Sequence, residues 1–280
     1  DAEAWVRLAW GHLQRGQQID AGDALNKAQA LDEDHPEVIL LKGRMAQMNR
    51  RADLATELYE RFLEAGHDDL DVRLFLAERA LRDGTDSEKA VRHLEAAKAC
   101  FPRHIGRDSP YLQLARLYRG SGEIEKAMGE LESFAAIAAE HYGVRKELKT
   151  WYRSKKDHAK VATICEEMVD ISPYGANVAR REPPDMDLHR HYAEALIELG
   201  RMDEALRERR VQVALGRLIP EEGKVGAGVV KDYIELGNML LDRGDAAGAM
   251  TQALAALRLS PSDASAHMLK RRAQEAGGDK

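Results

Sequence analysis

The sequence predicts an all-α fold in which short helices follow one another as helix-turn-helix repeats. Two observations indicate this class: a composition that favours helices, and a set of apolar and small residues that recurs with a period of about 34 residues. Ala, Leu, Glu and Arg dominate the 280 residues, charged residues make up 32% and aromatic residues only 5%. These are helix-forming residues, and so few aromatic residues leave little material for β-sheets.

The repeat is clearest near the C-terminus, in a frame that begins at Val230. Its recurring residues are Tyr233, Leu236, Gly237, Leu240, Gly244, Ala249, Ala253, Ala256 and Pro261. The same frame recurs from Ala2, with Trp5, Leu8, Ala9, Gly16, Ala21 and Leu25, and from Asp108, with Tyr111, Leu114, Ala115, Gly122, Ala127 and Leu131. Conservative or weaker copies begin at residues 36, 70, 142 and 186. We therefore predict about seven repeats, starting near residues 2, 36, 70, 108, 142, 186 and 230.

At these positions the sequence resembles the tetratricopeptide repeat family, whose pattern is Trp, Leu-Gly and Tyr followed by Ala, Phe, Ala and Pro. The resemblance implies a right-handed α-solenoid, a single superhelix over residues 1–280 in which each repeat is stabilised by its neighbours. Small residues at positions 8 and 20 of each repeat let its two helices cross closely, and large residues fill the surrounding space. The repeat from Tyr142 departs from this pattern, because Lys149 occupies position 8.

Two segments lengthen the period, residues 174–186 and residues 216–229. The first contains Pro183 and Pro184, and the second contains Pro220 and four glycines. Proline cannot continue a helix and clustered glycine is entropically unfavourable within one, so both segments are predicted as inserted loops. Residues 263–275 are predicted as a C-terminal capping helix that covers the last apolar face of the array.

The charge balance argues against nucleic acid and membrane partners. Lys and Arg total 42 against 48 Asp and Glu, which gives a net charge of -6 and no sequence-wide attraction to phosphates. No apolar stretch approaches the roughly 18 residues of a membrane span, and no signal-peptide pattern is present. We therefore expect a soluble chain without membrane insertion, in the cytoplasm or the periplasm, and a start at Asp1 that suggests a piece of a longer polypeptide.

No motif for catalysis or metal binding is found. His189 and His191 are two residues apart, so on a helix they point in nearly opposite directions and cannot share one metal ion. Lys224, within a glycine-rich stretch, lacks the Ser or Thr that follows the lysine of a phosphate-binding loop. Cys100 and Cys165 are expected on separate helices, as small buried apolar residues rather than a disulfide. We expect no enzyme activity, no metal and no cofactor.

The predicted function is protein binding, and two hypotheses remain open. The first is an interaction module or scaffold that holds a peptide or a partner protein in the concave groove of the superhelix, as the resemblance implies. The second is an accessory array that recruits substrate for a larger bacterial enzyme, such as a peptidase, or for an assembly factor whose other domain lies outside this sequence. A chaperone-tail clamp is not expected, since Ile234 occupies a position where that group of the family has Lys.

The resemblance also implies a lining for the groove, because positions 2, 5, 9, 12 and 13 of each first helix face the concave side in the family. The first three repeats contribute Val6, Trp10, Leu13, Leu40, Arg44, Gln47, Met48, Leu74, Glu78 and Leu81. The next three contribute Leu112, Arg116, Arg119, Lys146, Thr150, Arg153, Arg190 and Glu194. A ligand that matches this lining places apolar side chains on the earlier repeats and acidic residues on the later ones. The alternative, equally open from sequence, is that the leucines pack between helices and the arginines are solvated.

Overall fold

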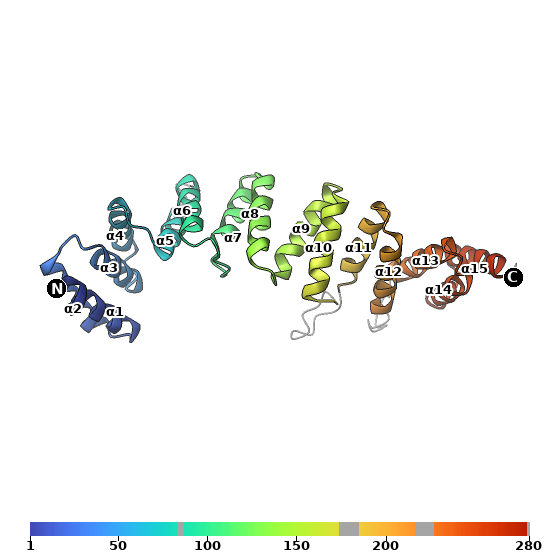
Figure 1. Cartoon of the computed structure of the whole chain (residues 1–280), viewed down its shortest axis with the longest axis horizontal. Helices are drawn as coiled ribbons and strands as arrows, with labels where there is room; N and C mark the ends of the chain where they lie inside the picture. The colour runs from blue at the N-terminus through green and yellow to red at the C-terminus, as the bar shows by residue number, and fades with distance from the viewer. Residues whose placement is uncertain (83–86, 174–184, 217–226, 279–280) are drawn as a thin grey trace. The chain divides into compact units, whose positions relative to one another are not determined.

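The computed structural model describes residues 1–82, 87–173, 185–216 and 227–278, and within these ranges the chain is helical with no strand (Figure 1). The helices are α1 (Ala2–Gln14), α2 (Gln18–Leu31), α3 (Pro36–Met48), α4 (Ala52–Glu64), α5 (Leu70–Arg82), α6 (Ser87–Cys100), α7 (Pro110–Gly120), α8 (Ile124–Ile137), α9 (Tyr142–Ser154), α10 (His158–Ile171), α11 (Met186–Glu198), α12 (Met202–Gly216), α13 (Ala227–Asp242), α14 (Ala246–Leu259) and α15 (Ala264–Gly278). The predicted all-α class is confirmed. Most residues of the predicted loops 174–186 and 216–229 lie outside the described ranges. The described ones are Asp185, which precedes α11, and residues that belong to α11, α12 and α13.

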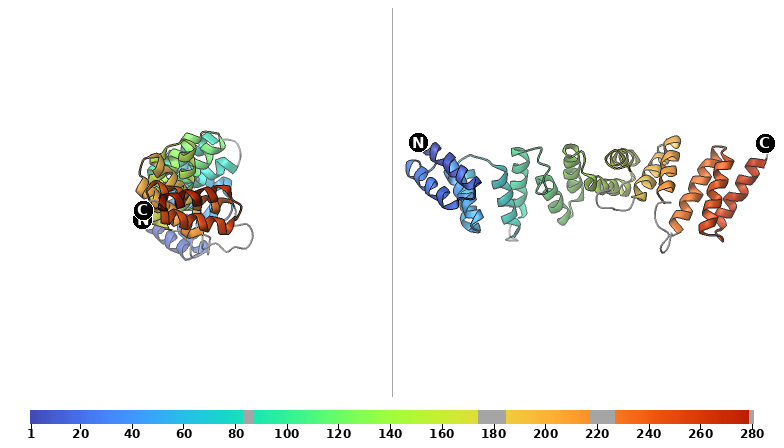
Figure 2. Two further views of the ribbon diagram at one scale, coloured as in Figure 1. Left: turned by 90° about the vertical axis from the view of Figure 1, so that its right-hand side faces the viewer. Right: turned by 90° about the horizontal axis from the view of Figure 1, so that it is seen from below.

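The helices pack as consecutive pairs. Each odd-numbered helix from α1 to α13 packs on the helix that follows it, and α15 packs on both α14 and α13. The helices α13, α14 and α15 lie side by side in Figure 1 and in the right-hand view of Figure 2. The chain divides into two compact units, Asp1–Ala138 with α1 to α8 and Ala139–Lys280 with α9 to α15. The single superhelix over both units stays a prediction.

The turn inside six of the pairs repeats one hydrogen-bond pattern, and the turn between α5 and α6 lies outside the described residues. After α1, the amide of Gly16 donates to the carbonyl of Leu13 at 3.0 Å, and the amide of Gln17 donates to that of His12 at 2.9 Å. This pair of bonds satisfies carbonyls at the end of the helix and places one residue in the left-handed region, where glycine is favoured. A residue with a positive φ occurs at the same position of six repeats: Gly16, Arg50, Gly122, Lys156, Gly200 and Gly244.

In the pairs other than α9–α10, the residues at the predicted crossing positions are small. The residues at positions 8 and 20 are buried alanines in most repeats: Ala9, Ala21, Ala55, Ala77, Ala115, Ala127, Ala193, Ala205 and Ala249. At Gly43 of α3 the approach is closer still, since a Cβ added there would lie 2.5 Å from Cε1 of Tyr59 on α4. The ring of Tyr59 is itself buried against Phe75. A side chain larger than hydrogen therefore has no room at this crossing.

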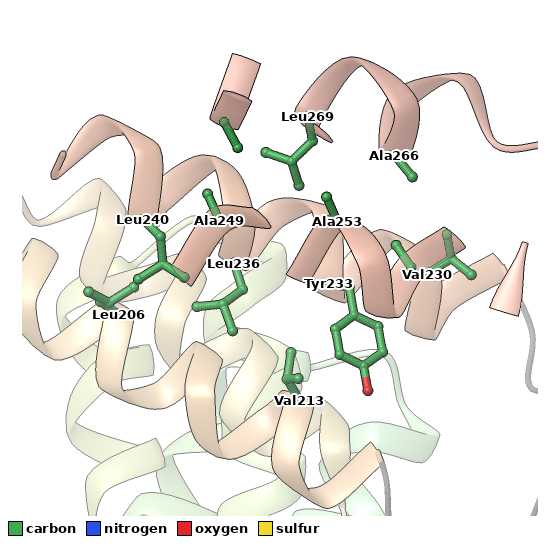
Figure 3. Packing of buried hydrophobic residues seen from close by; sticks show 12 residues of the cluster. Leu206, Val213, Val230, Tyr233, Leu236, Leu240, Ala249, Ala253, Ala266 and Leu269 are labelled. Carbon is green, nitrogen blue, oxygen red and sulfur yellow. The ribbon is translucent and has the colours of Figure 1, made fainter. Parts of the chain in front are cut away.

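The last helix completes the core of the second unit. A cluster of buried residues joins α12, α13, α14 and α15, and Figure 3 shows its side chains directed toward one another, among them Leu206, Leu240, Ala253 and Leu269. Leu269 of α15 packs where Gly237 of α13 leaves space, because a Cβ on that glycine would lie 2.4 Å from Cδ2 of the leucine. The helix that follows the seventh pair thus buries an apolar face of its own on that pair.

The pair α9–α10 is the exception to small-residue packing. Lys149 occupies the crossing position and is only 2% exposed. Burial lowers the pKa of Lys149 from its ordinary 10.5, an effect that the carboxylate of Asp185 opposes. Position 20 of the same pair is Val161, which is larger than the alanine of the other pairs. A lysine side chain is therefore buried where the other pairs bury a methyl group or nothing.

We predict that Gly43→Ala destabilises the protein by about 1–3 kcal/mol, because the added methyl group clashes with the buried ring of Tyr59. The measurement is urea unfolding followed by far-ultraviolet circular dichroism. The control is Gly129→Ala in α8, where nothing lies within 4 Å of the added Cβ and removal of a helical glycine stabilises by about 0.5–1 kcal/mol. Equal effects of the two substitutions would contradict the close approach at Gly43.

We predict that Lys149→Met raises the free energy of unfolding by about 1–3 kcal/mol near pH 7, since it keeps the buried stem and removes the amine. The free energy of unfolding of wild type increases by this difference as the pH rises from the lowered pKa of Lys149 in the folded protein toward 10.5. The reason is that over this range the unfolded chain binds more protons than the folded one. The gain of the variant should therefore shrink at alkaline pH. Lys231→Met, at a side chain 73% exposed, is the control and should leave stability unchanged. A constant gain at every pH would show that the amine is not the cause.

Candidate functional site

An open groove of about 920 Å³ lies in the first unit, lined by one face of α1, α3, α5 and α7. Tyr59 of α4 and the residues just before α7 complete the lining. The groove therefore crosses the first helix of four successive pairs. Its two ends differ in chemistry, one being apolar and the other cationic.

The apolar end is formed by Trp10, Leu13, Met48, Leu74 and Phe75. Two of these side chains are unusually accessible for their size, since Trp10 is 40% exposed and Met48 is 51% exposed. Tryptophan and methionine at a concave surface provide large apolar contact areas for a ligand. This end can therefore accept an apolar side chain.

Arg44 contacts the apolar end of the groove and two neighbouring carboxylates of the protein. Its guanidinium lies 5.0 Å from the centre of the Trp10 ring, a cation-π arrangement. The same group lies 3.3 Å from Oδ2 of Asp69 and 3.3 Å from Oδ2 of Asp71. The charge of Arg44 is thus compensated by two carboxylates, and its contacts join α1, α3 and the start of α5.

The floor of the groove is a buried tyrosine that stays neutral. Tyr59 donates a hydrogen bond from its hydroxyl to Oε1 of Gln47 at 2.8 Å, and its ring meets that of Phe75 edge to face at 5.2 Å. Burial raises the pKa of Tyr59 to about 12, against the opposing effect of Arg44. At neutral pH the phenol of Tyr59 therefore donates a hydrogen bond within the groove lining and does not act as a base.

The cationic end consists of Arg107, from the loop before α7, and Arg116 of α7. The loop is fixed by its own hydrogen bonds: Nε2 of His104 lies 2.9 Å from Oδ1 of Asp108, and Nε2 of Gln113 donates to the carbonyl of Asp108 at 2.7 Å. The hydrogen bond from His104 lowers the pKa of Asp108. Both arginines are exposed, and neither forms an ion pair with a residue of the described ranges.

The structure brings eight of the predicted groove residues together: Trp10, Leu13, Arg44, Gln47, Met48, Leu74, Glu78 and Arg116. Val6 is 2% exposed and belongs to the core of α1, α2 and α3, so it offers no surface to a ligand. Leu40 packs on the core between α3 and α5. This agrees with the alternative in which the leucines of the predicted lining pack between helices. Leu112 and Arg119 are on α7 but do not line this groove.

The predicted basic residues of the second unit are engaged in ion pairs with the next helix pair. Lys146 lies 3.7 Å from Asp185, Arg153 lies 3.2 Å from Glu194, and Arg190 lies 3.4 Å from the buried Asp232. Arg190 also pairs with Asp187 on its own helix at 2.7 Å. These cations link successive pairs within the unit, and their charge is compensated before any ligand arrives.

Some residues of the groove lining were not predicted from the sequence. They lie just before α7 or next to predicted positions. These are Gln14, Tyr59, Asp71, Phe75, Arg107, Asp108 and Gln113. A signal for the loop residues was present, because the interval between the third and fourth frames is longer than the period. Nothing in the sequence indicates that this particular loop turns Arg107 toward the groove.

The two histidines considered as metal ligands have structural contacts of their own. His189 is buried, with Nδ1 2.7 Å from Oε2 of Glu208 and Nε2 2.8 Å from the carbonyl oxygen of Pro173. Burial lowers the pKa of His191 to about 4, so that ring is neutral at physiological pH. Among the described residues no three His, Cys, Asp or Glu side chains are grouped to hold a metal ion. In the same ranges no helix has the length and apolarity needed to cross a membrane.

Comparison with known proteins gives similarity to solved structures only. No family model and no curated protein matches the sequence. A tetratricopeptide repeat protein from Parabacteroides merdae matches over 98% of each chain at 12% identity and a TM-score of 0.45. YrrB, described as a tetratricopeptide protein with an unusual peptide-binding site, matches over 62% of this chain and 87% of its own at 17% identity and a TM-score of 0.46. A Cytophaga hutchinsonii protein that contains these repeats matches over 94% and 98% at 16% identity and a TM-score of 0.45. All three are described as proteins with tetratricopeptide repeats, and at this level of similarity nothing about a ligand is carried over.

The two cysteines should differ in reactivity. Cys100 is exposed at the end of α6, whereas Cys165 is fully buried in α10. Burial raises the pKa of Cys165 to about 12 and raises the pKa of Cys100 as well. We therefore predict that a chromogenic disulfide reagent near neutral pH slowly modifies one thiol of the native protein, and the second only after denaturant is added. Simultaneous modification of both thiols in the native protein would contradict the packing of α10.

Proposed function

We propose that the chain is a non-catalytic repeat scaffold that binds a protein through an extended peptide segment in the groove of the first unit. The observation that carries the proposal is the convergence of Trp10, Arg44, Met48, Leu74 and Arg116 from four successive pairs on one open groove. A groove that crosses several helices suits an elongated ligand better than a compact one. Peptides bound in helical grooves commonly depend on a few apolar anchors of this kind.

The apolar end is preorganised for such a ligand. The indole of Trp10 is fixed by Arg44, which is itself fixed by Asp69 and Asp71, so little side-chain freedom is lost when a ligand binds. The buried contact between Tyr59 and Phe75 supports the groove from below. A rigid apolar surface with a polar surround is the arrangement that gives high affinity per unit of buried area.

The test is selection of a random peptide library, displayed on phage, against the full chain. Selected peptides should bind Trp10→Ala at least tenfold more weakly than wild type, because the indole supplies the largest apolar contact of the groove. Ile19→Ala is the matched control, since Ile19 is 83% exposed on α2 and does not line the groove. It should change affinity less than twofold, as measured by fluorescence anisotropy of the labelled peptides.

A second variant keeps the test independent of a single residue. Met48→Ala combined with Leu74→Ala removes apolar contacts from α3 and α5 while Trp10 stays in place. Circular dichroism should show an unchanged helical spectrum for each variant. If wild type selects no peptide, or if selected peptides bind both groove variants as well as they bind the control, the groove is not the binding surface.

A further inference from the structure

The charge inside the groove of the first unit is uncompensated at one end only. Its acidic residues all have cationic or histidine partners: Asp71 lies 3.3 Å from Arg44, Glu78 lies 2.7 Å from Arg82, and Asp108 lies 2.9 Å from His104. A basic ligand would therefore have to compete for carboxylates that are already engaged. The unmet charge of the groove is positive.

That positive charge belongs to Arg107 and Arg116. Both line the groove, both are exposed, and no carboxylate of the described residues pairs with either. Three other arginines of the predicted lining differ in this respect, because Arg44 in the same groove and Arg153 and Arg190 in the second unit all have carboxylates within 3.5 Å. Guanidinium groups bind carboxylates in charge-assisted hydrogen bonds, which gives them a definite ligand preference.

The loop that carries Arg107 keeps this arginine near the groove without a ligand. The hydroxyl of Tyr111 donates to the carbonyl of Pro102 at 3.0 Å, and the amide of Ser109 donates to that of Gly106 at 3.0 Å. With the His104–Asp108 contact, these bonds tie both ends of the loop to the start of α7. The position of Arg107 is thus fixed by its neighbours on either side in the chain.

We infer that the peptide bound in this groove carries an acidic side chain that Arg107 and Arg116 hold, and a large apolar side chain that lies against Trp10, Met48 and Leu74. The inference rests on the proposed function and adds the chemistry of the ligand to it. It assigns a role to Arg107, which no repeat position predicts. The opposite arrangement of a basic peptide finds no unpaired carboxylate in the groove.

The experiment uses three pools of synthetic peptides, acetylated at one end and amidated at the other so that no terminal charge remains. All pools carry a Leu, Phe or Trp followed by a variable spacer of small residues, and they differ in one later position, which is Glu or Asp, Gln or Asn, or Lys or Arg. Retention on the immobilised full chain is measured by mass spectrometry at about 0.15 M salt, where long-range attraction between exposed charges is screened. Wild type should retain the acidic pool at least tenfold better than the amide pool, and the basic pool least.

Substitutions test whether the two arginines cause this preference. Arg107→Gln with Arg116→Gln should abolish the preference for the acidic pool, and the corresponding change of both to Glu should reverse it in favour of the basic pool. Arg103→Gln is the matched control, because Arg103 is an exposed arginine of the same loop that does not line the groove. It should leave the preference of wild type intact.

The outcomes separate this inference from the function on which it rests. If the amide pool is retained as well as the acidic pool and Trp10→Ala loses both, the acidic ligand is wrong and the groove stands. If no pool is retained above the bare resin and no displayed peptide is selected, the proposed function itself fails. If Arg103→Gln weakens the preference as much as the combined Arg107→Gln and Arg116→Gln change, the effect is one of general surface charge and the inference is overturned.

Discussion

The close approach of the two helices within each pair is the constraint on which the rest of the structure depends. At Gly43 the ring of Tyr59 occupies the space of a side chain, and elsewhere the corresponding positions hold buried alanines such as Ala9 and Ala21. A helix turns by about 100° per residue, so the residue that faces the crossing decides which residues face away from it. Once the residue at position 8 of a first helix faces the second helix of its pair, the direction of every other side chain on the first helix follows.

The groove of the first unit is a consequence of this geometry. The residues that directly follow the crossing positions of α1, α3, α5 and α7 are Trp10, Arg44, Glu78 and Arg116, and all four line the groove. Packing and function are therefore divided between adjacent residues of one helix. The packing residue stays small and apolar in all four pairs, whereas the next residue varies from aromatic to acidic to basic. This variation gives the groove its apolar end and its cationic end.

The sequence was sufficient for the fold and for part of the groove. Burial of alanines at a fixed period and left-handed turns at Gly16, Gly122 and Gly244 leave a direct signal, because both favour small residues, although Arg50 and Lys156 occupy two of these turns. Ion pairs leave no such signal: whether Arg153 is available depends on Glu194, 41 residues later, and their contact is known only once the helices are packed. Val6 illustrates a second limit, since a position that faces the groove in the family lies in the core of this chain. The contribution of Arg107 depends on an irregular loop, to which no periodic argument applies.

Hydrogen exchange of the full chain with and without a selected peptide tests most directly whether the face formed by α1, α3, α5 and α7 is the binding surface. We expect slower exchange on binding in the groove-lining helices and in residues 101–109, with little change in α2, α6, α8 and the helices of the second unit. Protection confined to those other helices, with unchanged exchange along α1, α3, α5 and α7, would contradict it.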